Sequence, residues 1–226
     1  MLKTCCENVR KNVPLVHNIT NYVTVNDVAN VLLACGGSPI LLDPVGAGAS
    51  GLRTNTALNL MKELDLTVIR GNISEIKTLA LGSGTTKGVD ADVADRVTEE
   101  NLEDSIRFVK HFAKESGSIV AVTGAIDLVS DGETCYVIRN GRPEMGKITG
   151  TGCQLSGMMT AFVAANPENQ LEAAAAAVCM MGLAGEIGWS RMQEGHGNST
   201  YRNRIIDAIY NMDGETLEKG AKYEVR

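Results

Sequence analysis

The sequence predicts an α/β fold with a mostly parallel central sheet flanked by helices. Two observations predict it: short apolar runs rich in β-branched residues alternate with longer segments of helical periodicity. In addition, Gly-rich or polar turns follow the ends of several apolar runs. A chain of 226 residues is long enough for one well-buried domain and short for two. We therefore expect a single domain over residues 1–226.

The first half of the chain yields most of the expected strands. A helix is expected over Asn26–Cys35, where apolar residues recur at helical spacing and a Gly-Gly pair follows. Buried strands are expected where four or five apolar residues run together, and amphipathic helices between them. The further elements expected up to residue 123 are strands at Pro39–Leu42, Leu66–Arg70 and Ile119–Thr123, and helices at Thr54–Leu64, at Ser74–Leu81 and from a cap at Thr98.

The second half is expected to be a hairpin followed by helices. Two short apolar runs flank Asp131-Gly132, a dipeptide typical of hairpin turns. Helices are expected over Cys153–Ala164, Asn169–Ser190 and Arg204–Met212. The Ala-rich stretch Ala173–Gly185 is too short to span a bilayer, and it predicts a buried helix.

Composition excludes several classes of protein. The net charge of −6, with no Lys/Arg-rich run, argues against a nucleic-acid partner. The N-terminal residues form no apolar signal segment, so we expect a cytoplasmic protein without a membrane anchor. Six cysteines at irregular spacing favour free thiols over a disulfide framework or a zinc site.

The run Thr149-Gly150-Thr151-Gly152-Cys153 precedes a predicted helix and is a candidate anion site. Its glycines allow a tight turn that aims backbone N–H groups at an anion, and the helix N-terminus adds positive potential. Such a site suits the charge on a transferring phosphoryl group. In the first helical turn, Cys153 is placed to act as a base, because thiol pKa falls at helix N-termini. Taken alone, the turn could also simply begin a helix, and most free cysteines are inert.

Two carboxylates and an arginine follow neighbouring predicted strands. Asp43 ends one strand, Arg70 ends the next, and Glu75 opens the helix that follows. Two carboxylates can hold Mg²⁺ together with waters and phosphate oxygens, and an arginine suits a polyphosphate. Read singly, Asp43 could cap a turn and Glu75 could pair with Ser74 at a helix start. His17 could contact a ligand or be structural, while His111 and His196 receive no catalytic role.

These residues, in this order, resemble the hydroxyethylthiazole kinases of the ribokinase-like group. The resemblance covers nearly the whole chain, and cysteine stands at position 153 where the wider group usually has aspartate. The matching stretches are Pro14–Val23, Leu42–Gly48, Ile69–Ile76, Lys87–Asp90, Val120–Gly124, Thr149–Cys153, Ala184–Glu186 and Ile206–Ala208.

The resemblance implies a ribokinase-like fold and ATP-dependent phosphorylation of the primary alcohol of 5-(2-hydroxyethyl)-4-methylthiazole, in thiamine biosynthesis or salvage. It also implies a homotrimer with active sites between subunits. The implied roles are Cys153 as base; Gly150, Thr151 and Gly152 as anion hole; Asn21 and Val23 beside the thiazole; Arg70 and Thr123 on ATP; and Asp43 and Glu75 organising Mg²⁺ and phosphate.

One departure from the family pattern is large. Between Ile40 and Leu41 the family carries at least one more βαβ unit, roughly 30 residues or more, whereas here Ser38-Pro39-Ile40 joins Leu41-Leu42-Asp43 directly. Three explanations stay open: residues omitted from the sequence, an error of gene assembly, or a genuine deletion. The chain could accordingly be an active thiazole kinase, a related hydroxymethylpyrimidine-type kinase, or a nucleotide-binding remnant with little activity.

Overall fold

The computed structural model describes residues 1–12, 41–81, 86–87, 90–91 and 96–226. The chain divides into two compact units, which are described separately: Met1–Pro39 with Ile138–Tyr223, and Ile40–Val137 with Glu224–Arg226. The expected helix Asn26–Cys35 and the first part of the expected strand Pro39–Leu42 lie outside the described residues. The expected single domain stays a prediction.

A six-stranded sheet runs in the order β1-β2-β5-β6-β7-β8. Parallel pairing joins β1, β2 and β5, with Leu42 opposite Ile69 and Arg70 opposite Ala121. β5 and β6 pair antiparallel, and the expected hairpin follows, with Gly132 at a φ of 100°. The α/β fold class is therefore confirmed. The strands are β1 (Leu41–Leu42), β2 (Val68–Gly71), β5 (Ile119–Val122), β6 (Asp127–Ser130), β7 (Cys135–Ile138) and β8 (Tyr223–Val225), and β3 (Thr86–Lys87) pairs separately with β4 (Asp90–Ala91).

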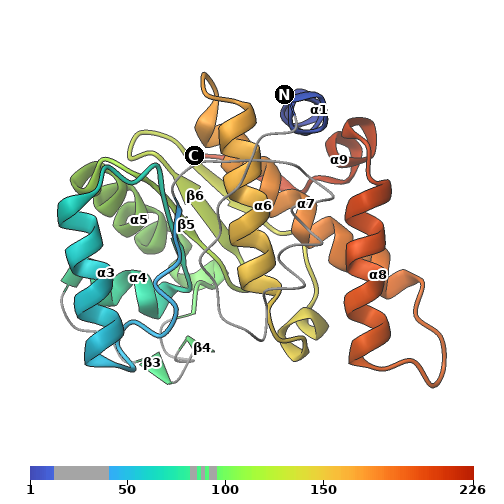
Figure 1. The fold of residues 1–226 in the computed structure, drawn as a ribbon, viewed down its shortest axis with the longest axis horizontal. Coiled ribbons are helices and arrows are strands. Elements are labelled where there is room, and N and C mark those ends of the chain that lie inside the picture. Colours follow the sequence, from blue (N-terminus) through green and yellow to red (C-terminus); the bar gives the residue numbers. More distant parts are fainter. Residues whose placement is uncertain (13–40, 82–85, 88–89, 92–95) are drawn as a thin grey trace. The chain divides into compact units, whose positions relative to one another are not determined.

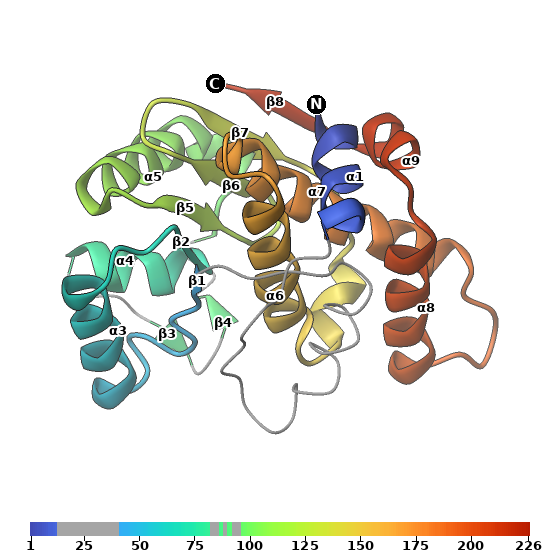
Figure 2. The same cartoon turned by 45° about the horizontal axis from the view of Figure 1, so that its top comes forward.

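Among the described residues of the second unit, the α-helices are α3 (Gly51–Glu63), α4 (Ile73–Leu81) and α5 (Leu102–Ser116). α5 packs on β5 and β6 (Figure 2) and buries one face, including Ile106, Val109 and Phe112. Thr98 forms a reciprocal capping box with Asn101 across the short 3₁₀ helix η2 (Glu99–Asn101), so the expected cap at Thr98 is confirmed. α3, by contrast, buries only Ala57 among its residues.

The first unit is built from helices: α1 (Leu2–Asn12), α6 (Thr151–Ala165), α7 (Gln170–Ser190), α8 (Asn198–Asn211) and α9 (Gly214–Gly220), with the 3₁₀ helix η3 (Pro143–Lys147). The three helices expected in this region are present, although α8 begins six residues before Arg204. α1 and α9 were not expected, although Asp213, directly before α9, is a residue type that often caps a helix.

The Ala-rich stretch Ala173–Gly185 lies inside a longer helix, α7. The helix extends beyond that stretch to 21 residues and is long and apolar enough to cross a membrane. However, 83% of its apolar window is buried inside the protein, and Ala173 to Ala177 are fully buried. This burial is what a core helix of a globular protein shows, so the expectation of a buried helix is confirmed.

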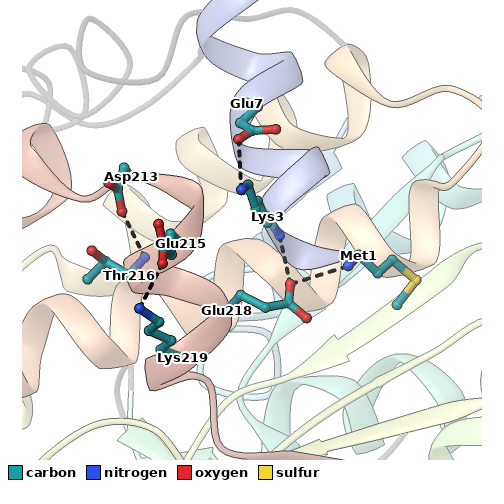
Figure 3. Close-up of polar contacts among 8 residues, drawn as sticks. All are labelled: Met1, Lys3, Glu7, Asp213, Glu215, Thr216, Glu218 and Lys219. Carbon is teal, nitrogen blue, oxygen red and sulfur yellow. Dashed lines mark hydrogen bonds and ion pairs between the residues drawn. The ribbon is translucent and has the colours of Figure 1, made fainter.

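Side-chain and backbone contacts join α1 and α9, which lie side by side in both views (Figures 1 and 2). Figure 3 shows the carboxylate of Glu218 accepting hydrogen bonds from the Lys3 amide at 2.9 Å and from the Met1 ammonium at 3.3 Å. Asp213 caps α9 by accepting the Thr216 amide at 2.7 Å. A side chain at Gly214 would collide with the Lys3 backbone. These contacts hold the first and last helices of the unit together.

Candidate active site

Arg70 lies at the end of β2 and bridges the ends of the two neighbouring strands. Its Nη1 donates to Asp43 Oδ2, just after β1, at 3.1 Å. Its Nη2 donates to Thr123 Oγ1, just after β5, at 2.6 Å. Because the three strands are parallel, their carboxyl ends meet at one edge, which is where open α/β sheets bind ligands. The Arg70 and Asp43 side chains are only 12% and 14% exposed.

Glu75 joins this group as a tie between two loops. One carboxylate oxygen, Oε1, accepts the amide of Gly46 at 2.8 Å, and the other, Oε2, accepts the amide of Asn72 at 2.9 Å. The loop after β1 and the loop after β2 are therefore held by one buried side chain. We call Asp43, Arg70, Glu75 and Thr123 the strand-end cluster.

Glu75 also has a capping role, with a different partner from the one that the sequence suggested. Its own amide donates to Asn72 Oδ1 at 2.9 Å, so Asn72 and Glu75 form a reciprocal box at the start of α4. The suggested capping pair of Glu75 with Ser74 was wrong, because the helix begins one residue before Ser74, at Ile73. Burial raises the pKa of Glu75, while the hydrogen bonds from Gly46 and Asn72 oppose that rise.

Asp127 is a further acidic residue near the cluster that the sequence did not single out. Its Oδ1 accepts the Gly124 amide at 2.7 Å, which closes the turn directly after Thr123. Burial raises the pKa of Asp127 to about 7, against the lowering effects of that hydrogen bond and of the Arg70 charge. The signal that could have found it is the acidic residue three positions after a glycine at a strand end.

The glycine turn, Thr149–Cys153, lies in the first unit. Gly150 is the N-cap of α6 with a left-handed φ of 94°, and no side chain of the described residues caps the helix. Cys153 is the third residue of α6 and is partly exposed, whereas Cys5, Cys6, Cys135 and Cys179 are buried. Burial raises the pKa of Cys5 to about 11 and that of Cys135 to about 12. Their burial fits the inert role that most free cysteines have.

The segment leading to the glycine turn is held against α7. Glu186 accepts the Gly141 amide at 2.9 Å and the Lys222 ammonium at 2.6 Å. A methyl group at Gly182 would lie 2.6 Å from Asn140 Cβ, and one at Gly185 would lie 2.2 Å from Met145 Sδ. The bare face of α7 therefore lets residues 140–145 pack directly on the helix, and this fixes the approach to the turn.

The structure brings four of the predicted site residues together within one unit. Asp43, Arg70, Glu75 and Thr123 form the strand-end cluster, while Gly150, Thr151, Gly152 and Cys153 belong to the glycine turn of the other unit. Asn21, Val23 and His17 lie outside the described residues. Within the part of the chain that the structure describes, no three His, Cys, Asp or Glu side chains gather as a metal cluster.

Comparison with known proteins identifies relatives over the whole length. The model of the hydroxyethylthiazole kinase family matches residues 6–41 and 37–215. The chain is 48% identical to a hydroxyethylthiazole kinase of Clostridium acetobutylicum, over 99% of each chain. It is 35% identical to hydroxyethylthiazole kinase 2 of Methanosphaera stadtmanae, over 98% of each chain.

Solved structures of kinases are also similar to this chain. A hydroxyethylthiazole kinase protein from Pyrococcus horikoshii matches with a TM-score of 0.84 and 28% identity, covering 100% of this chain and 98% of that one. A pyridoxal kinase from Staphylococcus aureus in complex with AMP-PCP and pyridoxal matches with a TM-score of 0.51 at 19% identity, covering 92% of this chain and 70% of that one. At that identity the second likeness concerns the fold alone.

The alignments also show that the chain lacks an internal segment that its relatives have. The alignment with the Clostridium acetobutylicum protein spans 271 positions, but the chain has 226 residues, so at least 45 positions are empty in this chain. The two pieces of the family match meet at residues 37–41. The gap therefore agrees with the missing segment expected between Ile40 and Leu41, immediately before β1 at the edge of the sheet.

Proposed function

The chain belongs to the hydroxyethylthiazole kinase family, and on this premise we propose that it transfers the γ-phosphoryl group of ATP to the primary alcohol of 5-(2-hydroxyethyl)-4-methylthiazole. The product would enter thiamine biosynthesis or salvage. The observation that carries the proposal is the Arg70 guanidinium, which bridges Asp43 and Thr123 at the ends of three adjacent parallel strands. Ligands of open α/β sheets bind at such an edge.

The nucleotide side of the reaction is assigned to Arg70 and Thr123. The Nε group of Arg70 is buried and has no hydrogen-bond partner among the described residues. A buried donor without a partner is costly, so a phosphate oxygen that accepts from it would gain more than a usual hydrogen bond. Thr123 Oγ1 accepts from Arg70, which leaves its own hydroxyl proton free to be donated to a second phosphate oxygen.

Asp43 and Glu75 are assigned to Mg²⁺. The pair suits this ion, which commonly takes one or two carboxylates and completes its shell with waters and substrate phosphates. Each Glu75 oxygen already accepts one backbone amide but has a second lone pair. When bound, Mg²⁺ would offset negative charge on the phosphates. The protein's own contribution is to hold both loops still, through the two amides that Glu75 accepts.

Cys153 is assigned as the base and the glycine turn as the anion hole. The Cys153 thiolate accepts the alcohol proton while the alcohol oxygen forms a bond to the γ-phosphorus. The bond between that phosphorus and the bridging oxygen breaks, and ADP leaves with the electron pair. Amides of Gly150, Thr151 and Gly152 at the start of α6 would donate to the transferring phosphoryl oxygens, supported by the helix dipole.

The remaining assignments rest on the family resemblance. Asn21 and Val23 would contact the thiazole ring, the enzyme would work as a homotrimer, and it would be cytoplasmic. The segment absent before β1 bears on these assignments, because in the family it forms part of the thiazole-side wall and the subunit contact. The trimer is tested by measuring the mass of the native protein in solution.

The function is tested by measuring ADP release with and without the thiazole alcohol. We expect thiazole-dependent release by the wild-type protein, and a decrease in kcat of about 100-fold or more for Cys153→Ala, the usual range for a lost general base. Cys153→Asp should retain part of the activity, since a carboxylate can also accept the proton. Cys179→Ala is the matched control, because Cys179 is a buried thiol on α7. Equal turnover by wild type and Cys153→Ala would exclude Cys153 as the base.

The same assay separates the competing functions. A remnant without its substrate pocket would bind ATP but release no ADP in response to the alcohol. A hydroxymethylpyrimidine-type kinase would respond to the pyrimidine alcohol instead. The intact mass of the purified protein should be measured first, because a mass well above 24.0 kDa would mean that the protein contains the segment and that the sequence omits it.

A further inference from the structure

Arg53, in the first turn of α3, lies across the loop that leads out of the strand-end cluster. Its Nη1 donates to the carbonyl oxygen of Val45 at 3.3 Å, a long and therefore weak hydrogen bond. The side chain is exposed. The guanidinium is therefore kept at this loop without being enclosed by other parts of the protein.

Gly46 makes this close approach possible. A methyl group on Gly46 would lie 2.7 Å from Nη1 and 3.3 Å from Cδ of Arg53, and the residue has a left-handed φ of 75°. The Gly46 amide donates to Glu75 Oε1 at 2.8 Å. Gly46 thus lies beside Arg53 and is hydrogen-bonded to Glu75, so it is the residue between the guanidinium and the strand-end cluster.

The charges at this edge of the sheet favour a further cation when a phosphate is bound. Among the described residues of the strand-end cluster, Arg70 is the one cation, and it already donates to Asp43 and Thr123. The carboxylates of Asp43 and Glu75 are assigned to Mg²⁺, and the carboxyl group of Asp127 lies near Arg70. A nucleotide phosphate or a phosphate ester brings more negative charge to the same edge. Arginine is the side chain best suited to bind that phosphate, because its planar N–H donors match the phosphate oxygens.

We propose that Arg53 is an additional phosphate-binding residue of the kinase, contacting a phosphoryl group held at the strand-end cluster. The inference deepens the proposed function and depends on it for the presence of a phosphate at this edge. The phosphate can belong to the nucleotide or to the phosphorylated product, and the two sources are separated by experiment. A merely structural Arg53 would clamp the Val45–Gly46 turn and have no preference for anionic ligands.

The test compares Arg53→Ala and Arg53→Lys with Lys62→Ala, which removes an exposed cation from the last turn of the same helix. We would measure KM for ATP, kcat, and the dissociation constants of ADP and of the thiazole phosphate ester, at low and at high salt. Arg53→Ala should weaken binding of the phosphate-bearing ligand about 10-fold or more at low salt, and less at high salt. Arg53→Lys should recover part of that loss, because lysine restores the charge but not the planar donors, and Lys62→Ala should match the wild type.

Each outcome decides the proposal. Weakened binding of ADP alone identifies the nucleotide as the source of the phosphate, and weakened binding of the ester alone identifies the product. Arg53→Ala that binds both ligands as Lys62→Ala does overturns the proposal. So does a loss that is independent of salt and is not recovered by lysine, because that pattern belongs to a structural clamp.

The proposed function can fail separately. Wild-type protein that binds ADP but shows no thiazole-dependent turnover would contradict the kinase function while the ADP measurement still judges Arg53. Wild-type protein that binds neither ADP nor the ester would contradict both.

Discussion

The strand-end cluster and the glycine turn are two proposed anion-binding regions built by different means. The cluster uses side chains from elements far apart in sequence, with Arg70 reaching Asp43 27 residues earlier and Thr123 53 residues later. The turn uses consecutive backbone amides at the start of α6, shaped by the positive φ of Gly150. Replacing one side chain should therefore disrupt the cluster at several points, whereas the turn should be sensitive to backbone conformation.

Arg70→Ala is expected to have the largest effect. It removes both bridging hydrogen bonds and the ion pair between Arg70 and the largely buried Asp43 carboxylate, and breaking a buried ion pair typically costs about 3–5 kcal/mol. Catalytic efficiency for ATP should fall about 100-fold or more, as measured by coupled ADP release alongside thermal unfolding. Arg107→Ala is the control, since its ion pair with Asp104 is exposed and should matter little. Near-normal efficiency for ATP in Arg70→Ala would mean that the cluster does not bind the nucleotide.

Gly150→Ala tests the backbone-built region and should have an intermediate effect. A left-handed conformation costs a non-glycine residue about 1–2 kcal/mol, so the turn should change shape or become strained. We expect kcat to fall about 10-fold with a modest loss of stability. Gly117→Ala provides the match: Gly117 also has a positive φ, 66°, but it ends α5 and has open space around it. Comparable unfolding temperatures with a kcat defect in Gly150→Ala alone would support the role of the turn, and equal kcat in both variants would contradict it.

The prediction with the smallest expected effect on catalysis concerns the dependence of stability on pH. Because burial raises the folded-state pKa of Asp127 to about 7, the folded protein holds a proton that the unfolded chain releases near pH 4. The free energy of unfolding should therefore fall as pH rises from about 4 to 7. Asp127→Asn keeps an oxygen acceptor for the Gly124 amide but cannot ionise, so its advantage over wild type should grow across that window in denaturant titrations.

Asp213 supplies the opposite sign in the other unit. Hydrogen bonds from Thr216 lower the pKa of Asp213, so its stabilising contribution should be present above about pH 4 and lost as pH falls further. Asp213→Asn should therefore lose stability relative to wild type only above that pH. If Asp127→Asn, like Asp213→Asn, lost stability relative to wild type as pH rises, burial would not be the dominant influence on the pKa of Asp127.

Much of the fold could be predicted because its signals are local. The apolar runs predicted β2 and β5 to within two residues, and the capping pattern at Thr98 predicted the start of the α5 region. The start of α3 was missed by three residues, although Ser50, its N-cap, is a residue type that often precedes a helix. α1 and β8 were missed because they depend on distant partners. Directly after β8, for example, the backbone of Arg226 exchanges two hydrogen bonds with that of Cys135, a residue distant in the sequence.

For the site, the sequence by itself determined the kinds of residue and their places at strand ends and at a helix start. Strand ends, glycine turns and helix caps depend on residues within a few positions of one another, and such patterns can be read directly. Only the tertiary structure decided that Arg70 bonds both Asp43 and Thr123, that Glu75 ties Gly46 to Asn72, and that Arg53 lies against Gly46. Most of these contacts join loops separated by tens of residues, and their choice of partner depends on the order of strands in the sheet, which no local pattern specifies.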